Sequence, residues 1–339
     1  MSELNAPGVD AQEDPLELLW PRELGTASLQ EMLGSDVDGL LNEVLSQTVT
    51  QPLWTLMDRG GKRWRPIISR SSYLACGGKL PAPEAVFQVV ELLHTGSLVV
   101  DDIQDVATER RGAPPIHHLY GLPMALNAAN SAYFRALSAL KRLLPGPARL
   151  RALDMLSEEM FNAHLGQALD LALGKALRAG KPVKAPHYRI LAAAKTGALV
   201  RMAARLGAIA ADAPEALESH VARWAGGVGL AYQIRDDVED VDEGLSDISA
   251  GRITLPLLLT LESVSAEESK LLFAHFGTGE LPADARDAIL ALMKKHDVVE
   301  RGRQHAREAA QASNFALNAL PPSADRDSLQ QLTLKLSGV

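Results

Sequence analysis

The stretch Asp101-Asp102-Ile103-Gln104-Asp105 decides how this chain is interpreted, and Asp236-Asp237-Val238-Glu239-Asp240 repeats its spacing. On a helix, the first and last aspartates of each stretch lie at i and i+4, one turn apart on the same face. At a separation of about 6 Å and an effective dielectric constant of about 20, two such carboxylates repel by roughly 3 kcal/mol. Two clusters with the same spacing favour divalent-cation sites over two solvated acidic helix ends. Oxygen ligands without His or Cys favour Mg²⁺, which binds one or two carboxylates together with substrate phosphates.

Composition narrows the class of protein. The chain has 339 residues, of which 47% are hydrophobic, so we expect a globular protein with a substantial core. A net charge of −8 and an aromatic content of 4% argue against a nucleic-acid partner. Cys76 is the only cysteine, which excludes an internal disulfide and fits the reducing cytoplasm, where we expect the protein to work. The apolar runs are too short for a membrane span, and residues 1–14 lack the hydrophobic segment of a secretory signal.

The pattern along the chain is helical. Residues 1–20 show little apolar periodicity and predict a flexible N-terminal tail. The remainder, 21–339, is rich in Ala and Leu, and Val86, Val90 and Leu93 recur at helical spacing before the first acidic cluster. Predicted helix breaks are the Gly- and Pro-containing segments 77–83, 144–147, 174–186, 211–214 and 277–282. We therefore expect a single all-α domain over residues 21–339, a helical bundle around a deep apolar cavity.

Basic residues beside glycine accompany the acidic clusters. They stand in Gly60-Gly61-Lys62-Arg63-Trp64-Arg65-Pro66, in Arg110-Arg111-Gly112, in Lys195-Thr196-Gly197 and in Gly251-Arg252-Ile253-Thr254. Glycine lets the backbone approach a ligand closely, and the arginine guanidinium is a planar fork that matches phosphate oxygens. Each group alone is typical of a solvated surface charge, and His94 alone is typical of a core histidine. Together with two acidic clusters they indicate a phosphate-bearing ligand.

These motifs together resemble those of the trans-isoprenyl diphosphate synthases, the polyprenyl synthetase family, and in particular the geranylgeranyl diphosphate synthases. The motifs also include His94-x-x-Ser97-Leu98, Gly166-Gln167-x-x-Asp170 and Gln233-x-x-Asp236, and they follow the family's order. The resemblance implies the isoprenoid synthase fold and a homodimer. It also implies an enzyme that joins an allylic diphosphate (dimethylallyl, geranyl or farnesyl) to isopentenyl diphosphate, head to tail, and gives a longer all-trans prenyl diphosphate.

The resemblance also implies the roles of individual residues. About three Mg²⁺ ions would be held by the two clusters, that is by Asp101, Asp102, Asp105, Asp236, Asp237 and Asp240. The allylic diphosphate would be neutralised by Arg110, Lys195 and Arg252, and the resulting carbocation would be faced by Thr196 and Gln233. Isopentenyl diphosphate would be seated by Lys62, Arg65, His94 and Arg111. A diphosphate leaves an allylic carbon only where cations already meet its growing charge, and a positioned alkene must intercept the cation before water does.

Product length is expected to depend on where the cavity ends. Gly96 and Ser97, on the helical turns before Asp101, are too small to block a growing tail. Tyr133 and Phe134, together with His164, resemble the floor of eukaryotic-type geranylgeranyl diphosphate synthases. Periodicity alone would favour simple core aromatics at these two positions. With the resemblance we expect a C20 product, and a longer prenyl chain is the alternative.

Two other classes of protein remain to be weighed. A class I terpene cyclase shares the first acidic motif, but it pairs that motif with polar ligands at i, i+4 and i+8. Here those positions are Asp236, Asp240 and Gly244, so the last acidic ligand is missing. A non-catalytic partner subunit of a heteromeric prenyl synthase would lose one aspartate cluster, whereas this chain keeps both.

Overall fold

The structure, a computed structural model, describes residues 14–35 and 37–338. All regular secondary-structure elements among these residues are helices. This confirms the all-α prediction. Contacts divide the described residues into two compact units. The first unit comprises the described residues up to Arg70 and Leu80–Leu153, and the second comprises Ser71–Lys79 and the described residues from Asp154 onward. Within this described part of the chain, no helix combines the length and the apolar character that a membrane span needs.

The helices of the first unit are α1 (Pro15–Leu19), α2 (Thr26–Leu33), α3 (Gly39–Leu45), the π-helical η1 (Ser46–Thr50), α4 (Gln51–Met57), α6 (Glu84–Phe87), α7 (Val89–Gln104), α8 (Ile116–Tyr120) and α9 (Leu122–Leu143). Those of the second unit are α11 (Ala185–Ala210), α12 (Glu215–Glu243), α13 (Ser246–Ala250), α14 (Leu255–Ser263), α15 (Ala266–His275), α16 (Ala283–Lys295), α17 (Val298–Ala316), the 3₁₀-helical η2 (Leu317–Ala319) and α18 (Ala324–Ser337). Two helices span the sequence boundaries between the units, α5 (Trp64–Ala75) and α10 (Gly146–Arg178).

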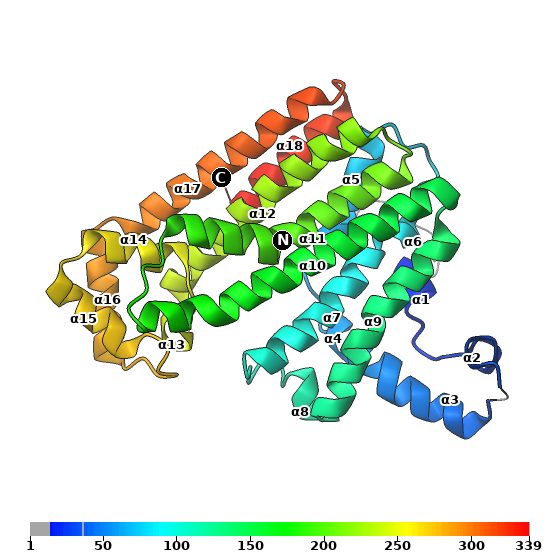
Figure 1. The fold of residues 1–339 in the computed structure, drawn as a ribbon, viewed down its shortest axis with the longest axis horizontal. Helices are drawn as coiled ribbons and strands as arrows, with labels where there is room; N and C mark the ends of the chain where they lie inside the picture. The colour runs from blue at the N-terminus through cyan, green and yellow to red at the C-terminus, as the bar shows by residue number, and fades with distance from the viewer. Residues whose placement is uncertain (1–13, 36, 339) are drawn as a thin grey trace. The chain divides into compact units, whose positions relative to one another are not determined.

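In the first unit, α7 packs along α9 (Figure 1). The face of α9 that is buried consists largely of alanines at helical spacing, namely Ala125, Ala128, Ala129, Ala132, Ala136 and Ala139. Such small side chains let two helix backbones approach closely. A Cβ atom built on Gly96 of α7 would lie 2.9 Å from the Ala129 carbonyl oxygen and 3.3 Å from the Ala132 Cβ. Gly96 is therefore a site of close helix packing.

The predicted flexible tail is shorter than the sequence indicates. Residues 1–13 lie outside the described residues, but Asp14 caps α1, because its carboxylate accepts a hydrogen bond from Leu16 N at 3.0 Å. Leu16, Leu19 and Trp20 are buried, and the Trp20 indole Nε1 donates to the Thr50 carbonyl at 3.3 Å. The tail prediction is wrong for residues 14–20, because a helix of five residues is too short to show the periodicity that identifies it.

In the second unit, α12 packs against α11 and against α17 (Figure 1). Glycines allow both contacts. A Cβ on Gly229 of α12 would lie 2.7 Å from the Gly197 Cα of α11, and a Cβ on Gly302 of α17 would lie 2.6 Å from a methyl carbon of Val238. The stretch of α12 that leads to the second acidic cluster is thus held by two neighbouring helices.

The helix break predicted at residues 174–186 begins later than expected. Helix α10 continues through Gly174 to Arg178. A Cβ on Gly174 would overlap the Gly251 carbonyl oxygen, and Arg178 Nη1 donates to the Gly277 carbonyl at 2.7 Å. Gly174 therefore allows a loop to approach the helix, and it does not end the helix.

Replacing Leu16 by alanine is expected to lower the free energy of unfolding by about 2–5 kcal/mol, because the lost side chain is fully buried and leaves a cavity. Leu18 lies in the same helix and is 56% exposed, so Leu18→Ala is the matched control. It should change the free energy of unfolding by at most about 0.5 kcal/mol. Urea unfolding followed by far-UV circular dichroism measures both. Equal effects of the two substitutions would contradict the placement of α1 in the core.

Candidate active site

The first acidic cluster ends α7. Asp101 and Asp102 lie in its last turns, and Asp105 is its C-terminal cap. The C-terminus is the negative end of the helix dipole, where a carboxylate is disfavoured by about 0.3–1 kcal/mol. The last turn of α7 contains no basic residue that would offset this. The cluster therefore needs cations from outside its own helix.

Arg110 supplies part of that positive charge. Its Nε donates to Asp102 Oδ1 at 2.7 Å, and its Nη2 lies 2.5 Å from the same oxygen and 3.8 Å from Asp101 Oδ2. Asp102 is buried, and its other oxygen, Oδ2, accepts no hydrogen bond from the described residues. Such an orphaned buried oxygen is unfavourable, and it is a donor atom that a hard cation takes. The first cluster thus fits Mg²⁺.

The second cluster has the same position in α12, whose last turn also lacks a basic residue. Asp237 is buried within it, and both of its carboxylate oxygens accept hydrogen bonds. Gln233 Nε2 donates to Oδ1 at 2.8 Å, and the Leu255 amide donates to Oδ2 at 3.2 Å. Burial raises the pKa of Asp237 to about 7, although the nearby Tyr188 hydroxyl and the Gln233 amide lower that pKa. A cation close to this carboxyl would favour its ionised form.

Asp240 and Asp236 differ in their partners. Asp240 accepts hydrogen bonds from Ser246 Oγ at 2.6 Å and from the Asp247 amide at 3.2 Å, so it anchors the start of α13. The Asp236 side chain is 38% exposed, and the guanidinium of Arg235 lies 3.6 Å from it. Among residues 14–35 and 37–338, no group of three or more His, Cys, Asp or Glu side chains is arranged so that it could hold a metal ion without further ligands. Mg²⁺ commonly completes its ligand shell with water and substrate phosphates.

Two of the three residues predicted to bind the allylic diphosphate, Lys195 and Arg252, line a pocket of the second unit with a volume of about 100 Å³, whereas Arg110 belongs to the first unit. Its polar lining includes Asp170, Tyr188, Lys195, Gln233, Asp237, Asp247, Arg252 and Thr254. Lys195 Nζ lies 2.5 Å from Asp170 Oδ2, and Arg252 Nη1 lies 3.3 Å from Asp247 Oδ1. Alternating cations and carboxylates suit a metal-bound diphosphate, because the phosphate oxygens bind the cations while carboxylates bind the metal.

A larger groove of about 800 Å³ lies over α12 and α17 of the same unit. None of the residues predicted from the sequence lines it. We identify the smaller pocket as the candidate site, because the charged groups that the chemistry requires converge there.

Thr196 and Gln233, predicted to face a carbocation, lie together beside this pocket. Thr196 Oγ1 donates to Gln233 Oε1 at 2.5 Å, while the amide nitrogen of Gln233 donates to Asp237. These two hydrogen bonds fix which end of the Gln233 amide carries the oxygen. The oxygens of Thr196 and Gln233 are therefore held side by side.

The turn of α11 that carries Lys195 and Thr196 touches two other helix backbones of the second unit. A Cβ on Gly166 of α10 would overlap the backbone of Lys195, and Gly229 of α12 packs against Gly197. Only glycine fits at these contacts. The Gly166-Gln167 motif that the sequence singles out therefore has a packing role next to the site.

The residues predicted to seat isopentenyl diphosphate lie in the first unit. Arg111 has a left-handed backbone, with φ of 54°, and its Nη1 donates to the carbonyls of Leu56, at 3.1 Å, and Gly60. A Cβ on Gly61 would lie 2.7 Å from Arg111 Nη2. The approach of this guanidinium thus requires glycine at position 61, while Gly60 has a left-handed backbone with φ of 84°. Lys62, which follows them, is exposed.

His94 and a buried glutamate share this region of the first unit. Burial lowers the pKa of His94 well below its ordinary value, and the neighbouring Arg65 and Arg111 lower it further, so His94 is neutral. Glu91, three residues earlier on α7, is also buried. Burial raises the pKa of Glu91, and Arg65 and Arg111 lower it. Glu91 is not among the residues predicted from the sequence, although a lone carboxylate on an apolar helix face indicates a buried charge.

The predicted product-length residues differ in how far each is buried within its own unit. Tyr133 is next to Gly96, where a Cβ would lie 3.1 Å from the Tyr133 ring, and burial with the nearby Asp101 raises its pKa to about 12. Phe134 is 72% exposed, because consecutive helical residues point about 100° apart. His164 is also exposed, with Nδ1 2.8 Å from the Met160 carbonyl. Phe134 and His164 are thus exposed in the single chain, and their assignment to the floor stays a prediction.

Fold and site together define an all-α protein whose acidic helix ends and basic pocket suit a metal-bound diphosphate. The family model for polyprenyl synthetase matches residues 46–293, and the chain belongs to that family. It is a trans-prenyltransferase, as the sequence predicts. The short chain isoprenyl diphosphate synthase of Methanothermobacter thermautotrophicus is 28% identical to it, over 89% of this chain and 94% of that protein.

Two solved structures establish the isoprenoid synthase fold. The decaprenyl diphosphate synthase from Rhodobacter capsulatus superposes with a TM-score of 0.81 and 21% identity, over 96% of this chain and 94% of that one. The geranylgeranyl pyrophosphate synthase from Corynebacterium glutamicum, solved with isoprenyl diphosphate and magnesium, gives a TM-score of 0.79 and 21% identity, over 95% and 98%. The predicted fold is thereby confirmed, and it is shared by proteins named for different product lengths.

Gly166→Ala is expected to lower the free energy of unfolding by about 1–3 kcal/mol, because the added methyl group would overlap the α11 backbone. It should also reduce turnover, since Lys195 lies at the point of contact. Gly39→Ala in α3 is the control, because no atom lies within 4 Å of its added Cβ, and a gain of about 0.4–1 kcal/mol is expected. Thermal unfolding and a prenyl transfer assay compare the two variants with the wild type. A Gly166→Ala protein with wild-type stability and turnover would contradict the close approach of the two helices.

Proposed function

We propose that this prenyltransferase condenses an allylic diphosphate with isopentenyl diphosphate and releases the C20 product, geranylgeranyl diphosphate. Family membership supports the class of reaction. The observation that carries the proposed site is the pocket that brings Lys195, Gln233, Asp237 and Arg252 together. The relative named as a short chain synthase supports the product length, and a longer prenyl chain is the alternative.

The metal in this proposal is Mg²⁺, about three ions as in the family resemblance. We assign Asp101, Asp105 and Asp236 as its main ligands. The other three aspartates support them: Asp102 binds Arg110, and Asp237 and Asp240 already accept protein hydrogen bonds. The oxygen-only donors favour this ion. Mg²⁺ would act as a Lewis acid that stabilises the negative charge of the departing diphosphate.

The pocket residues would first exchange partners. In the structure Lys195 is paired with Asp170 and Arg252 with Asp247. Binding of the allylic diphosphate would turn both cations toward its phosphate oxygens. The bond between the allylic carbon and the diphosphate oxygen then breaks, and the oxygens of Thr196 and Gln233 face the positive charge that remains.

In the first unit, Lys62, Arg65 and Arg111 would bind isopentenyl diphosphate. His94, being neutral, would add a hydrogen-bonding group there without adding repulsion to the arginines. The alkene of isopentenyl diphosphate attacks the allylic carbon and forms the new carbon–carbon bond. The resulting tertiary cation loses one proton, which we assign to the released diphosphate, and the product keeps the diphosphate of isopentenyl diphosphate.

We also propose a homodimer that works in the cytoplasm. Leu122, Leu126 and Phe134 of α9 are 52%, 39% and 72% exposed, and they follow one another at helical spacing. An apolar stripe of this kind on a soluble helix suits a protein partner, and a second copy is the family expectation. Sedimentation of the purified chain as a monomer would contradict the dimer.

The purified chain with Mg²⁺, farnesyl or geranyl diphosphate and labelled isopentenyl diphosphate should give an elongated diphosphate, and EDTA should abolish turnover. Asp236→Asn should lower kcat by about a hundredfold or more, equivalent to at least about 2.7 kcal/mol. Asp240→Asn is the matched control, expected to lose less than about tenfold, because both oxygens already serve α13. Mass spectrometry identifies the product. A hydrocarbon would indicate a terpene cyclase, and no turnover would indicate a partner subunit.

Tyr133→Ala is expected to lengthen the product beyond C20, because the ring that lies beside Gly96 is removed. Phe134→Ala is the matched control, and its product should keep the wild-type length because that ring lies outside the core of its own chain. Chain length is read by mass spectrometry of the extracted products. An active Tyr133→Ala enzyme that still stops at the wild-type length would remove Tyr133 from this role.

A further inference from the structure

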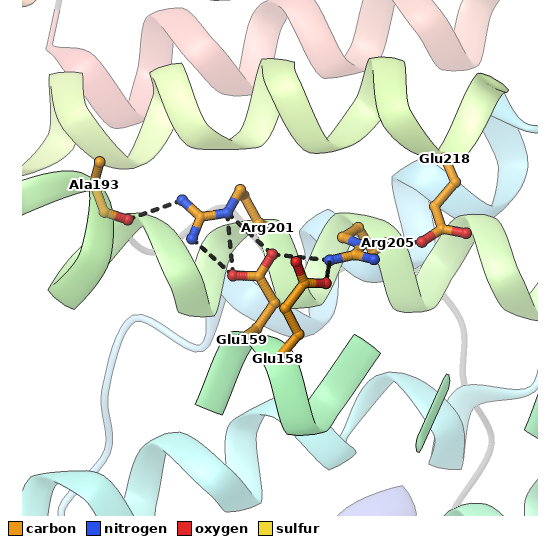
Figure 2. A network of polar contacts seen from close by, with 6 residues as sticks. All are labelled: Glu158, Glu159, Ala193, Arg201, Arg205 and Glu218. Carbon is orange, nitrogen blue, oxygen red and sulfur yellow. Dashed lines mark hydrogen bonds and ion pairs between the residues drawn. The ribbon is translucent and has the colours of Figure 1, made fainter. Parts of the chain in front are cut away.

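A partly buried network of charged side chains joins α10, α11 and α12 within the second unit (Figure 2). Glu159 of α10 is buried and receives Arg201 of α11 as a fork, through Nε at 3.0 and 3.1 Å and through Nη2 at 2.7 Å. Arg205, one turn further along α11, donates to Glu159 at 3.1 Å, to Glu158 at 2.8 Å and to Glu218 of α12 at 2.9 Å. Neither the acidic clusters nor the pocket includes these residues.

Arg201 makes one contact that Arg205 does not make. Its Nη1 donates to the Ala193 carbonyl at 2.8 Å, eight residues earlier on the same helix. In a regular α-helix that carbonyl pairs with the amide of Gly197. The guanidinium lies beside Gly197, where a Cβ would come within 3.1 Å of Nη1. Arg201 thus holds the turn between Ala193 and Gly197, which carries Lys195 and Thr196.

The same turn is confined on its other sides. The backbone of α10 touches it at Gly166, and the backbone of α12 touches it at Gly229. The fork between Arg201 and Glu159 adds a second connection between this turn and α10, besides the contact at Gly166. Arg201 is therefore the one side chain of the network that joins a fixed carboxylate on a neighbouring helix to the backbone of the substrate-binding turn.

We infer that Arg201 is a positioning residue for prenyl transfer, which acts through the Ala193 carbonyl on the turn that presents Lys195 and Thr196. Glu159 orients the Arg201 guanidinium for this contact. Arg205 joins the three helices without touching the turn and has a structural role. The inference rests on the proposed roles of Lys195 and Thr196 in the reaction.

Lysine cannot replace arginine here, because a single ammonium group cannot form the fork to Glu159 and reach the Ala193 carbonyl at the same time. Displacement of a reacting group by about 1 Å can cost about a hundredfold in rate. Arg201→Lys should therefore lower kcat by about tenfold to a hundredfold. The KM for isopentenyl diphosphate, whose proposed ligands lie in the first unit, should stay within about twofold of the wild-type value.

Arg205→Lys in the full-length chain is the matched control. It removes contacts to Glu158 and Glu218 and is expected to lower the melting temperature at least as much as Arg201→Lys does, yet to keep kcat within about threefold of wild type. If both substitutions reduce kcat in proportion to their loss of thermal stability, the role of Arg201 is structural and the inference is overturned. Wild-type kcat in Arg201→Lys overturns it as well.

A double-mutant cycle with Thr196→Ala provides a readout that structural damage would not change. If Arg201 acts through the turn, Arg201→Lys should cost several-fold less in the Thr196→Ala background than in the wild type, because one of the two groups it positions is already absent. Additive losses would overturn the inference. Should Arg201→Lys fail to fold, Glu159→Gln keeps the shape of the network and should show a smaller kcat loss with the same unchanged KM.

Different results would contradict the proposed function and the role of Arg201. If the wild-type chain does not elongate an allylic diphosphate, the proposed function fails. If the wild-type chain is active and the cycle is additive, only the role of Arg201 fails.

Discussion

Carboxylates crowd the C-terminal ends of α7 and α12, where the helix dipole already concentrates negative charge. No basic residue in the last turn of either helix relieves this repulsion. The chain responds with arginines from elsewhere, such as Arg110 on Asp102, and with hydrogen bonds from Gln233 and the α13 loop. These groups lower the repulsion without removing it. The proposed Mg²⁺ ions would supply the positive charge that is still needed.

Precise placement of the charged groups depends on very small residues. The turn with Lys195 is held by glycines of two neighbouring helices, and α7 meets the alanine face of α9 at Gly96. Close backbone packing leaves few alternative arrangements, so the polar groups at the site need not be held by their own side-chain contacts alone. The Arg201–Glu159 fork adds a directional polar contact to this packing. In the second unit, packing and the ion network therefore act on the same turn.

The fold and the product length are separate questions. Proteins named for decaprenyl and for geranylgeranyl products superpose on this chain equally well. The fold alone therefore does not set the product length, and we propose that single side chains beside the growing tail would set where it stops. Tyr133 beside Gly96 is the proposed position, and the exposed Phe134 belongs to another surface of α9.

The sequence by itself determined the helical class, the two acidic clusters and the basic groups that we propose bind phosphate. These features are local, because the spacing of i and i+4 within one helix already places the aspartates on one face. Tertiary structure decided that the carboxylate oxygens of Asp237 and Asp240 accept hydrogen bonds from other residues. It also decided that Phe134 is exposed and that Glu91 is buried near arginines. The network of Arg201 was equally invisible, because Glu159 lies 42 residues away from it in the sequence. Such pairs depend on how helices rotate and pack against one another, and helical periodicity carries no information about that.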